Sequence, residues 1–465
     1  MDTFELAGQW WLPESPNERK IGLIKYSDED GFTLKIPFGN LGNLPHSTEV
    51  GERVPILLGI LINGNNVTLV DAVMTNMKLN FPGAGSEEYK SLLGFIGSIE
   101  SESNPQIKQL QVNFSHLRDW VGLRPGKTKM VEDNETLISI DYHYEPPLET
   151  ELTVGDGWKI RLRHKADTTR FSMKGFWLMH DCNLILDLDE PLQFDKVEER
   201  FLIPLWQFMS FCIDRRTHIQ ELKILPFGQT NWIEVGRSQR QSAISGDFLM
   251  ECNMLLSMQQ ISNRTDEILR RWIEFKGDER RAISLLVGIN NDPASFYSDL
   301  RFLAASQALE AMSRVDANEN ELPDDEFERR FSVVLNSLED SKVRDWAERK
   351  LKYANSRNSS DLLRDLVINI GDYVSTLAPN RQKFLSDIRD NRNFYTHRDD
   401  RRAKRILEGS ELHILTQGLV CLLKASVLRR LGFSQEEIPN LMKDCEGCLQ
   451  WQVHVANQYS QNIAS

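Results

Sequence analysis

The chain has 465 residues, of which 40% are apolar and 26% charged, as expected for a folded globular protein of two or three domains. This composition excludes collagenous, low-complexity and mostly disordered classes. The formal net charge of −13 argues against a protein that coats nucleic acid through its whole surface. Residues 1–235 hold 23 basic and 34 acidic side chains, a net charge of −11, whereas residues 236–465 hold 32 and 34, a net charge of −2. The acidity therefore belongs almost entirely to the first half.

The sequence gives no sign of export or of a membrane span. No stretch approaches the roughly 18 uninterrupted apolar residues of a membrane helix. Residues 1–5 are acidic and lack the features of a signal peptide. Scattered cysteines predict reduced thiols rather than a disulfide framework; they are Cys182, Cys212, Cys252, Cys421, Cys445 and Cys448. We therefore expect a cytoplasmic protein with no membrane partner.

Residues 1–235 predict a β-rich domain. Turn-rich segments at residues 27–31 and 63–66 lie between strand patterns, which predicts two hairpins. The expected strands are Lys20–Tyr26, Phe32–Pro37, Val54–Ile62, Val67–Met74, Gln109–Phe114, Thr136–Tyr144, Trp158–His164, Phe171–Trp177 and Leu184–Leu188, followed by a helix at about Phe194–Ile213. Short strands separated by turns favour a sandwich-like domain or a barrel.

Seven of the ten tryptophans precede residue 236. We expect them to fill the core of the β-rich domain. The alternative is an aromatic face that binds a glycan or a peptide, with Trp10, Trp11, Trp158 and Trp177 as its functional residues.

From about residue 245 the apolar residues recur with a helical period. The expected helices are Phe248–Gln260, Asn263–Phe275, Glu279–Ile289, Ala294–Val315, Asp325–Leu338, Lys342–Tyr353, Ser360–Leu377, Arg381–Tyr395, Arg402–Leu431 and Gln435–Tyr459. Ser360 and Ser434 are the expected N-caps of two of them. The polar segment Gln229–Gly246 is the expected joint. We predict an α+β multidomain chain divided into residues 1–235 and 236–465, with a helical core at about 294–460.

The strongest functional motif is Arg392-Asn393-Phe394-Tyr395-Thr396-His397. A neutral histidine can take a proton from a ribose 2′-hydroxyl or give one to a leaving 5′-oxygen. An arginine can bind the phosphate and stabilise the charge of the transition state. An ideal helix turns by about 500° over five residues, which places Arg392 and His397 about 140° apart. The helix therefore ends or bends here, or the two side chains act together with a second protomer.

The motif lies in the densest basic stretch of the chain. Residues 381–405 hold nine basic and four acidic side chains, a net charge of +5. A helix would align four arginines in one stripe that could bind several phosphates; they are Arg398, Arg401, Arg402 and Arg405. The alternative is a solvated helix face whose charges form salt bridges.

Residues 392–397 resemble the Arg-Asn-x-x-x-His signature of HEPN domains. Residues 388–397 and 302–311 are similar to the ApeA-like branch, and Gly8–Pro13, Ile21–Ile24 and Gly31–Leu34 resemble the ApeA N-terminal domain. The resemblance implies a HEPN endoribonuclease of a prokaryotic abortive-infection system against phage. It also implies a homodimer or higher oligomer with two motifs at a composite site, and cleavage without metal that leaves a 2′,3′-cyclic phosphate and a 5′-hydroxyl.

The resemblance assigns catalysis to Arg392 and His397, with Asn393 and Glu310 orienting them. Glu310 borders an apolar helix stripe, and its alternative role is that of an N-cap or surface acid. The expected RNA contacts are Arg389, Tyr395 and the four-arginine stripe. No cofactor is expected, structured RNA such as tRNA is one candidate substrate, and the acidic N-terminal domain would sense a phage trigger and restrain the activity.

Two alternatives remain open at this point. In the first, the helical half is a non-catalytic HEPN module that dimerises and binds nucleic acid or protein. Separately, Cys445 and Cys448, with His454 downstream, have a spacing that zinc sites also use, but a second close pair is missing and cysteines three apart on a helix are more often small packing residues.

Overall fold

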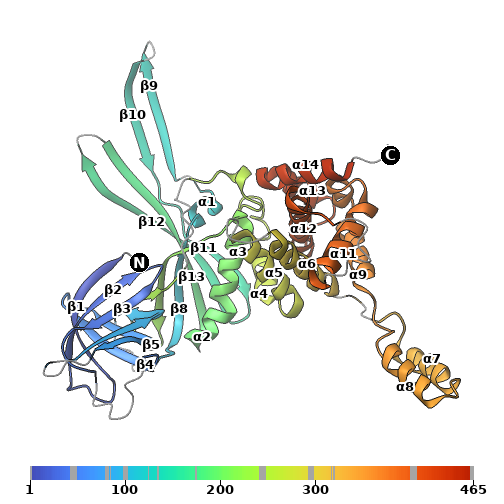
Figure 1. The fold of residues 1–465 in the computed structure, drawn as a ribbon. Coiled ribbons are helices and arrows are strands. Elements are labelled where there is room, and N and C mark those ends of the chain that lie inside the picture. Colours follow the sequence, from blue (N-terminus) through green and yellow to red (C-terminus); the bar gives the residue numbers. More distant parts are fainter. Residues whose placement is uncertain are drawn as a thin grey trace. The chain divides into compact units, whose positions relative to one another are not determined.

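The computed structural model describes residues 3–41, 50–78, 83, 85–97, 103–123, 125–133, 136–172, 175–239, 248–291, 298–315, 317, 320–397 and 406–460. The chain divides into two compact units. The N-terminal unit comprises Met1–Glu251 and Ser257–Ile273, and the C-terminal unit comprises Cys252–Leu256 and Glu274–Ser465. The first unit is β-rich and the second is helical (Figure 1), so the predicted fold class is confirmed.

Six strands of the N-terminal unit close into a barrel. They are β1 (Phe4–Trp11), β2 (Lys20–Ser27), β3 (Gly31–Ile36), β4 (Arg53–Leu61), β5 (Asn66–Lys78) and β6 (Ser86–Ser91). The order is β4-β1-β2-β3-β6-β5, and the ring closes because β5 pairs with both β4 and β6. Trp10, Phe32 and Tyr89 fill its interior. Gly59 gives the Trp10 ring its space, since a Cβ there would lie 2.5 Å from that ring.

The sheet continues beyond the barrel in the order β11-β12-β13-β8-β14-β15-β7-β5. These strands are β7 (Leu93–Ile96), β8 (Gln106–Phe114), β11 (Thr150–Gly155), β12 (Trp158–Ser172), β13 (Gly175–Gln193), β14 (Ile219–Pro226) and β15 (Ile233–Arg237). A separate hairpin pairs β9 (Gly126–Asp133) with β10 (Thr136–Tyr144). The expected strand Phe171–Trp177 is wrong, because Phe171 and Ser172 end β12 whereas Gly175 begins β13, and these two strands pair antiparallel.

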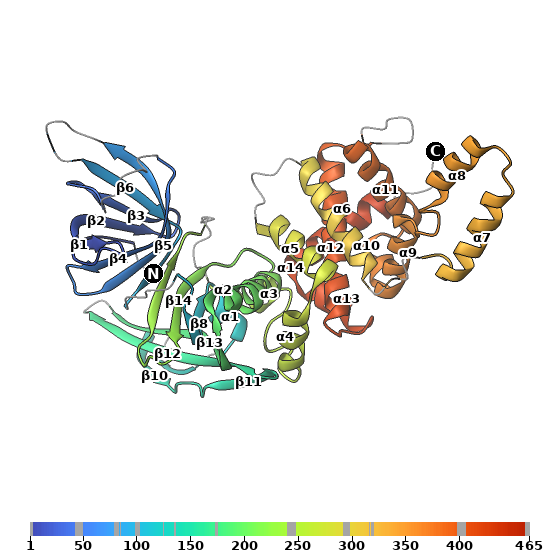
Figure 2. The same ribbon diagram turned by 90° about the horizontal axis from the view of Figure 1, so that it is seen from below.

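Short helices cover one face of this sheet (Figure 2). They are α1 (Leu117–Val121), α2 (Phe194–Val197), a π-helical turn (Glu198–Leu202) and α3 (Ile203–Ile213). Phe201 packs against Trp158 with 5.0 Å between the ring centroids, and Phe194 packs against Phe95 at 5.5 Å. Trp10, Trp11, Trp120 and Trp158 are all buried, which favours the core-filling role over a ligand-binding face; the Trp177 side chain lies outside the described residues.

The N-terminal unit extends past residue 235, the division expected from the sequence. Helix α4 (Thr265–Glu274) places Trp272 against Phe208 and Phe211, with centroids 5.3 and 5.2 Å apart. The Trp272 indole also donates a hydrogen bond of 2.8 Å to the Pro204 carbonyl. This packing joins α4 to the β-rich unit, and the structure therefore places the division near residue 273.

The helix expected over Phe248–Gln260 is wrong. The segment contains only a 3-10 turn at Glu251–Asn253. Ser257 and Gln260 explain the difference, because the Gln260 side chain accepts from the Ser257 backbone N–H and the Ser257 hydroxyl accepts from the Gln260 N–H. Such local side-chain hydrogen bonds compete with a helix.

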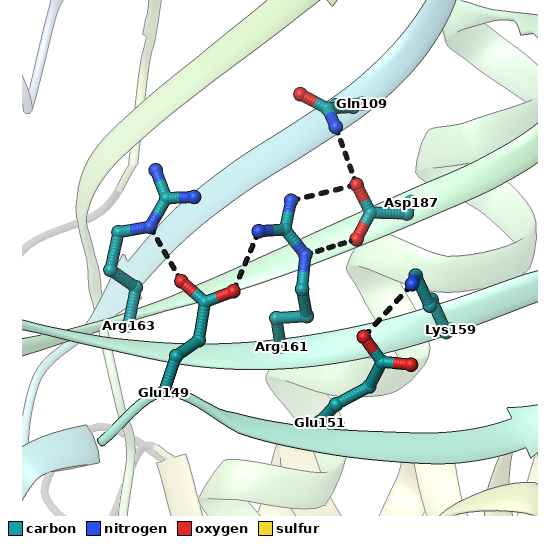
Figure 3. Close-up of polar contacts among 7 residues, drawn as sticks. All are labelled: Gln109, Glu149, Glu151, Lys159, Arg161, Arg163 and Asp187. Carbon is teal, nitrogen blue, oxygen red and sulfur yellow. Dashed lines mark hydrogen bonds and ion pairs between the residues drawn. The ribbon is translucent and has the colours of Figure 1, made fainter.

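A charge network covers the exposed face of β8, β11, β12 and β13 (Figure 3). The Arg161 guanidinium donates from Nε and Nη2 to Asp187 at 2.5 and 2.9 Å, and from Nη1 to Glu149 at 2.7 Å. Arg163 donates to the other Glu149 oxygen at 2.8 Å, and Gln109 donates to Asp187 at 2.5 Å. The hydrogen bonds from Arg163 and Arg161 hold the pKa of Glu149 below its usual value. The network ties the sheet's edge strand to its neighbours.

The C-terminal unit is a helical bundle around α12. Its helices are α5 (Gly277–Asn291), α6 (Ser298–Arg314), α7 (Asp324–Asn336), α8 (Ser341–Leu351), α9 (Ser359–Ile370), α10 (Tyr373–Leu377), α11 (Arg381–His397), α12 (Gly409–Arg430), α13 (Glu437–Asp444) and α14 (Glu446–Ser460). Among the described residues, α12 alone is long and apolar enough to cross a membrane, but 83% of its apolar window is buried. Its apolar character therefore fits its place at the centre of the bundle.

Three expected helices differ from the structure at their ends or in their middle. The helix expected over Ser360–Leu377 breaks at Gly371, whose φ of 79° is left-handed and ends α9. Asn358, and not Ser360, caps α9 by accepting from the N–H groups of Ser360 and Asp361. The helix expected over Gln435–Tyr459 breaks at Cys445, where the backbone is extended.

The third difference concerns the start of a helix. Helix α12 begins at Gly409, later than the expected Arg402, and residues 398–405 lie outside the described residues. The cap expected at Ser434 is confirmed, because Ser434 and Glu437 exchange reciprocal side-chain and backbone hydrogen bonds of 3.1 and 2.6 Å.

Candidate active site

Helix α11 carries the Arg-Asn-Phe-Tyr-Thr-His motif at its C-terminal end. Phe384, Ile388 and Asn391 are its buried positions, which fixes the face that it turns to the bundle. Arg392 and Asn393 are half-buried, whereas His397 is exposed and is the last residue of the helix. The helix does not break before His397, so Arg392 and His397 stay about 140° apart around its axis. One helix cannot present both side chains to the same phosphate from a single face.

Glu310 on α6 holds the Arg392 guanidinium. Its Oε2 accepts from Arg392 Nη2 at 3.1 Å, although 82 residues separate the two in sequence. Its Oε1 accepts from Arg314 at 3.1 Å and from the Ser359 hydroxyl at 3.0 Å. The carboxylate is therefore fixed by donors from α6 and α9 and fixes one nitrogen of Arg392 in turn. This geometry agrees with the expectation that the Glu310 carboxylate needs a partner. Glu310 lies within α6, so it is not a helix N-cap.

A pocket of about 540 Å³ opens between α6, the start of α9 and α11. Glu310 and Ser306 line it from α6, and Arg392 and Asn393 line it from α11. The Ser306 hydroxyl is buried and has no hydrogen-bond partner among the described residues. Arg389 and Arg364 also border the pocket, so three guanidinium groups border one concave surface. Each guanidinium is paired with a carboxylate, namely Glu310, Asp361 or Asp390, so a phosphate-containing ligand would bind through their remaining donors.

The Arg392 guanidinium keeps spare donor capacity. Beyond its bond to Glu310 it makes one long contact of 3.4 Å from Nη1 to the Asn393 side chain. Its Nε has no partner among the described residues, and 35% of its side chain is exposed. A guanidinium has five N–H groups, so most of them remain available to an incoming anion.

Asn391 and Tyr395 bind the chain where it returns after the motif. Asn391 is fully buried; its amide donates to the Asp387 carbonyl at 2.8 Å and accepts from the Leu407 N–H at 2.7 Å. The Tyr395 hydroxyl donates to the Leu407 carbonyl at 2.8 Å, and its ring packs against Phe302. Both its hydroxyl and its ring therefore make contacts within the fold, and the expected RNA contact of Tyr395 stays a prediction.

Of the other predicted site residues, Arg389 and His397 are described by the structure and the arginines of the stripe are not. Arg389 is 54% exposed and is paired with Asp390 at 2.8 Å, a hydrogen bond that raises the Arg389 pKa. The imidazole of His397 has no hydrogen bond or ion pair with any described residue. Arg398, Arg401, Arg402 and Arg405 lie outside the described residues, so the stripe stays a prediction.

Cys445 and Cys448 are buried. Cys448 accepts a contact of 3.5 Å from the buried Lys424 ammonium group. His454 instead packs against the Trp451 ring at 5.6 Å. The Sγ atoms of Cys445 and Cys448 lie within 4.8 Å of each other, whereas His454 does not belong to that group among the described residues.

Three site residues could not be assigned from the sequence alone. Ser359 lies in the run Asn358-Ser359-Ser360-Asp361, which marks a helix start but gives no sign of a bond to Glu310. Arg314 lies four residues after Glu310, a spacing common to many surface pairs on helices, which does not mark it as a site residue. Nothing in the sequence separates Asn391, which holds Leu407, from its exposed neighbours.

Comparison with protein families agrees with this arrangement. The model of the Apea-like HEPN family matches residues 303–437, which include most of α6, all of α9 and α11, and the whole pocket. The helical unit therefore contains a HEPN domain. The model of ApeA N-terminal domain 1 matches residues 5–272, more than half of the chain and nearly all of the N-terminal unit. The chain belongs to the ApeA family and is a HEPN-type anti-phage defence protein.

No curated protein and no solved structure matched the chain in the corresponding comparisons. The assignment of individual side chains to chemical roles therefore depends on the geometry of the pocket.

Proposed function

We propose that the C-terminal unit is an endoribonuclease that cleaves RNA by attack of a ribose 2′-hydroxyl on the adjacent phosphate, without a metal ion. The observation that carries the proposal is the Arg392 guanidinium on the pocket wall. Glu310 fixes one of its nitrogens at 3.1 Å, while its other donors stay available to a phosphate. His397, exposed at the end of the same helix, supplies a group suited to proton transfer.

The chemistry follows from these two side chains. One imidazole takes the proton of the 2′-hydroxyl, the 2′-oxygen forms a bond to phosphorus, and the bond from phosphorus to the 5′-oxygen breaks. A second proton donor protonates the leaving 5′-oxygen. Arg392 binds the non-bridging phosphate oxygens, whose negative charge grows in the transition state. The products are a 2′,3′-cyclic phosphate and a 5′-hydroxyl.

A second copy of the chain would complete this site. Because Arg392 and His397 point about 140° apart, one motif cannot both hold a phosphate and protonate the leaving group from one face. Two motifs from two protomers supply two imidazoles and two guanidinium groups. We therefore propose a homodimer through the HEPN domain, in which Asn393 orients the reacting groups and Arg389 with the Arg398–Arg405 stripe holds the RNA backbone.

The N-terminal unit is proposed to sense a phage signal and to restrain cleavage in uninfected cells. Residues 1–235 have a net charge of −11, which disfavours RNA binding there and suits an acidic cover for basic surfaces. We place the protein in the cytoplasm, where its RNA substrates are; tRNA is one candidate, since its cleavage would stop translation.

The test expresses wild-type protein and His397→Ala under phage challenge and sequences the RNA ends. We expect new 5′-hydroxyl ends and phage protection with the wild type and neither with His397→Ala. RNA cleavage that persists in the variant would refute the ribonuclease proposal. Protection that persists with no cleavage in either protein would favour a non-catalytic HEPN module. Purified protein that loses cleavage in EDTA would refute the metal-independent chemistry.

A further inference from the structure

Helices α7 and α8 form a hairpin that projects from the bundle (Figures 1 and 2). They pack against each other, and neither makes a comparable contact with another described helix. The base of the hairpin is held by Asn355, which is 7% exposed. Asn355 bonds Leu322 through both its side-chain oxygen and its side-chain nitrogen, at 2.8 and 2.9 Å. The hairpin therefore has a fixed base and an uncovered body.

The apolar side chains of this hairpin are largely exposed. Ala347 is the one buried residue of the two helices, and α7 has none. Trp346 is 57% exposed, Val343 45% and Val334 43%. Helices of 13 and 11 residues are marginally stable in water unless tertiary packing covers an apolar face. A partner surface is therefore expected over this hairpin.

The charges of the two halves of the hairpin are opposite; the first half is α7 with the loop up to Asp340, and the second is α8 with Lys352. Residues 324–340 hold six acidic and two basic side chains, a net charge of −4. Residues 341–352 hold five basic and two acidic side chains, a net charge of +3. Glu326 already pairs with both arginines of α7, Arg329 and Arg330, which leaves the outward charge of that helix acidic. A surface with one acidic and one basic helix is complementary to itself after a two-fold rotation.

We propose that the α7–α8 hairpin docks onto the same hairpin of a second copy of this chain, with α7 of each copy against α8 of the other. The pairing buries Val334, Val343 and Trp346 of both copies in a four-helix arrangement. The near-neutral sum of the two charges, −4 and +3, disfavours a nucleic acid as occupant. This docking proposal rests on the proposed function in one respect, namely that a composite active site needs a second copy of the chain.

The base of the hairpin leads directly to the candidate active site. The chain runs from Asn355 to Asn358, which caps α9, and on to Ser359, which donates to Glu310. Asn358 and Ser359 line the same pocket as Arg392. Dimerisation through the hairpin would therefore hold the second copy beside the pocket wall that positions Arg392.

The test uses charge reversal in the full-length chain. One variant makes α8 acidic with Lys342→Glu, Arg349→Glu and Lys350→Glu; the other makes α7 basic with Asp324→Lys, Asp325→Lys and Glu328→Lys. Sedimentation velocity should give twice 53.7 kDa for the wild type and 53.7 kDa for each variant alone. An equimolar mixture of the two variants should recover the doubled mass, because each helix again meets one of opposite charge.

A second pair of variants tests the apolar contact. Trp346→Glu should weaken the dimer about 30-fold or more, as expected for a buried aromatic at the centre of an interface. Ile62→Glu, at a site 77% exposed in the other unit, is the control and should leave the dimer unchanged. Circular dichroism checks that each variant is folded.

Three outcomes would overturn the proposal. These are a wild type that stays monomeric at micromolar concentration, variants that dimerise like the wild type, and a mixture that does not recover the dimer. The first or last outcome would point to another segment of the chain or to a different partner as the occupant. RNA cleavage is measured on the same samples, so a dimer without cleavage counts against the ribonuclease alone.

Discussion

Each unit of the protein contains an arginine held by carboxylates, and the two arrangements differ in how completely the arginine is used. Arg161 lies on the sheet of the N-terminal unit, is 16% exposed, and directs all three of its nitrogens to Asp187 and Glu149. Arg392 lies at the pocket of the C-terminal unit, is 35% exposed, and gives a single nitrogen to Glu310.

The difference separates a structural arginine from a ligand-binding one. An arginine whose donors are all satisfied within the chain stabilises the strands that it joins and has nothing left for an anion. An arginine that one carboxylate orients, while its other donors remain available, is prepared for a phosphate without further rearrangement. We therefore expect substitutions at the two sites to affect different measurements.

The largest effect is expected from Arg392→Ala. Removal of a group that stabilises transition-state charge lowers the rate by about 100- to 1000-fold. Single-turnover cleavage of RNA measures the loss. Arg161→Ala is the matched control and should cleave RNA within about twofold of the wild type. Equal losses in the two variants would abolish the distinction between the sites.

The opposite result is expected for stability. Asp187→Asn removes the charged acceptor of two Arg161 bonds and should cost the N-terminal unit about 2 kcal/mol, as for hydrogen bonds to charged groups. Calorimetry of the first unit's unfolding transition measures the loss. At a temperature where both proteins are folded, RNA cleavage should not change. A variant with the melting temperature of the wild type would show that the network does not stabilise the N-terminal unit.

A smaller effect is expected from Glu310→Gln. The neutral amide keeps the shape of the side chain but loses the charge that orients Arg392, which should lower the cleavage rate about tenfold. Ser359→Ala removes one of the donors to Glu310 and should have a weaker effect in the same direction. If Glu310→Gln instead changes only the melting temperature, Glu310 is a structural residue.

The smallest effect concerns acid. Arg163 and Arg161 hold the pKa of Glu149 below its ordinary value in the folded protein. The stability that this provides is present above the ordinary value of 4.5 and is lost as the pH falls through the folded value. The melting temperature of the N-terminal unit should therefore fall between pH 6 and pH 3. Glu149→Gln should show a shallower decline, and an unchanged slope would exclude Glu149 as a source of the acid sensitivity.

Local patterns in the sequence predicted much of the fold. The hairpin turns, the helical period after residue 245 and the cap at Ser434 depend on neighbouring residues, and the structure has each of them. The closure of β5 onto β6 and the docking of Trp272 on Phe208 depend on residues far apart in sequence. The period of the apolar residues does not encode such pairings. The domain boundary was therefore predicted at residue 235, whereas the N-terminal unit extends to residue 273.

The same limit applies to the site. The motif at residues 392–397 could be found in the sequence because its residues are adjacent. The bond from Arg392 to Glu310 crosses 82 residues and could be expected only from a resemblance. The sequence does not indicate that α7 and α8 are exposed, because their apolar residues recur with the same period as in any helix that packs in a bundle.

The most direct measurement is the cleavage of RNA by purified full-length protein in EDTA, with wild type, His397→Ala and Arg161→Ala compared at equal concentration. We predict that the wild type and Arg161→Ala release fragments ending in a 2′,3′-cyclic phosphate. His397→Ala should be slower by about 100-fold or more, as for the loss of a general acid–base group. Cleavage by His397→Ala at the wild-type rate would contradict the assignment of His397 as the proton-transfer group and, with it, the ribonuclease proposal.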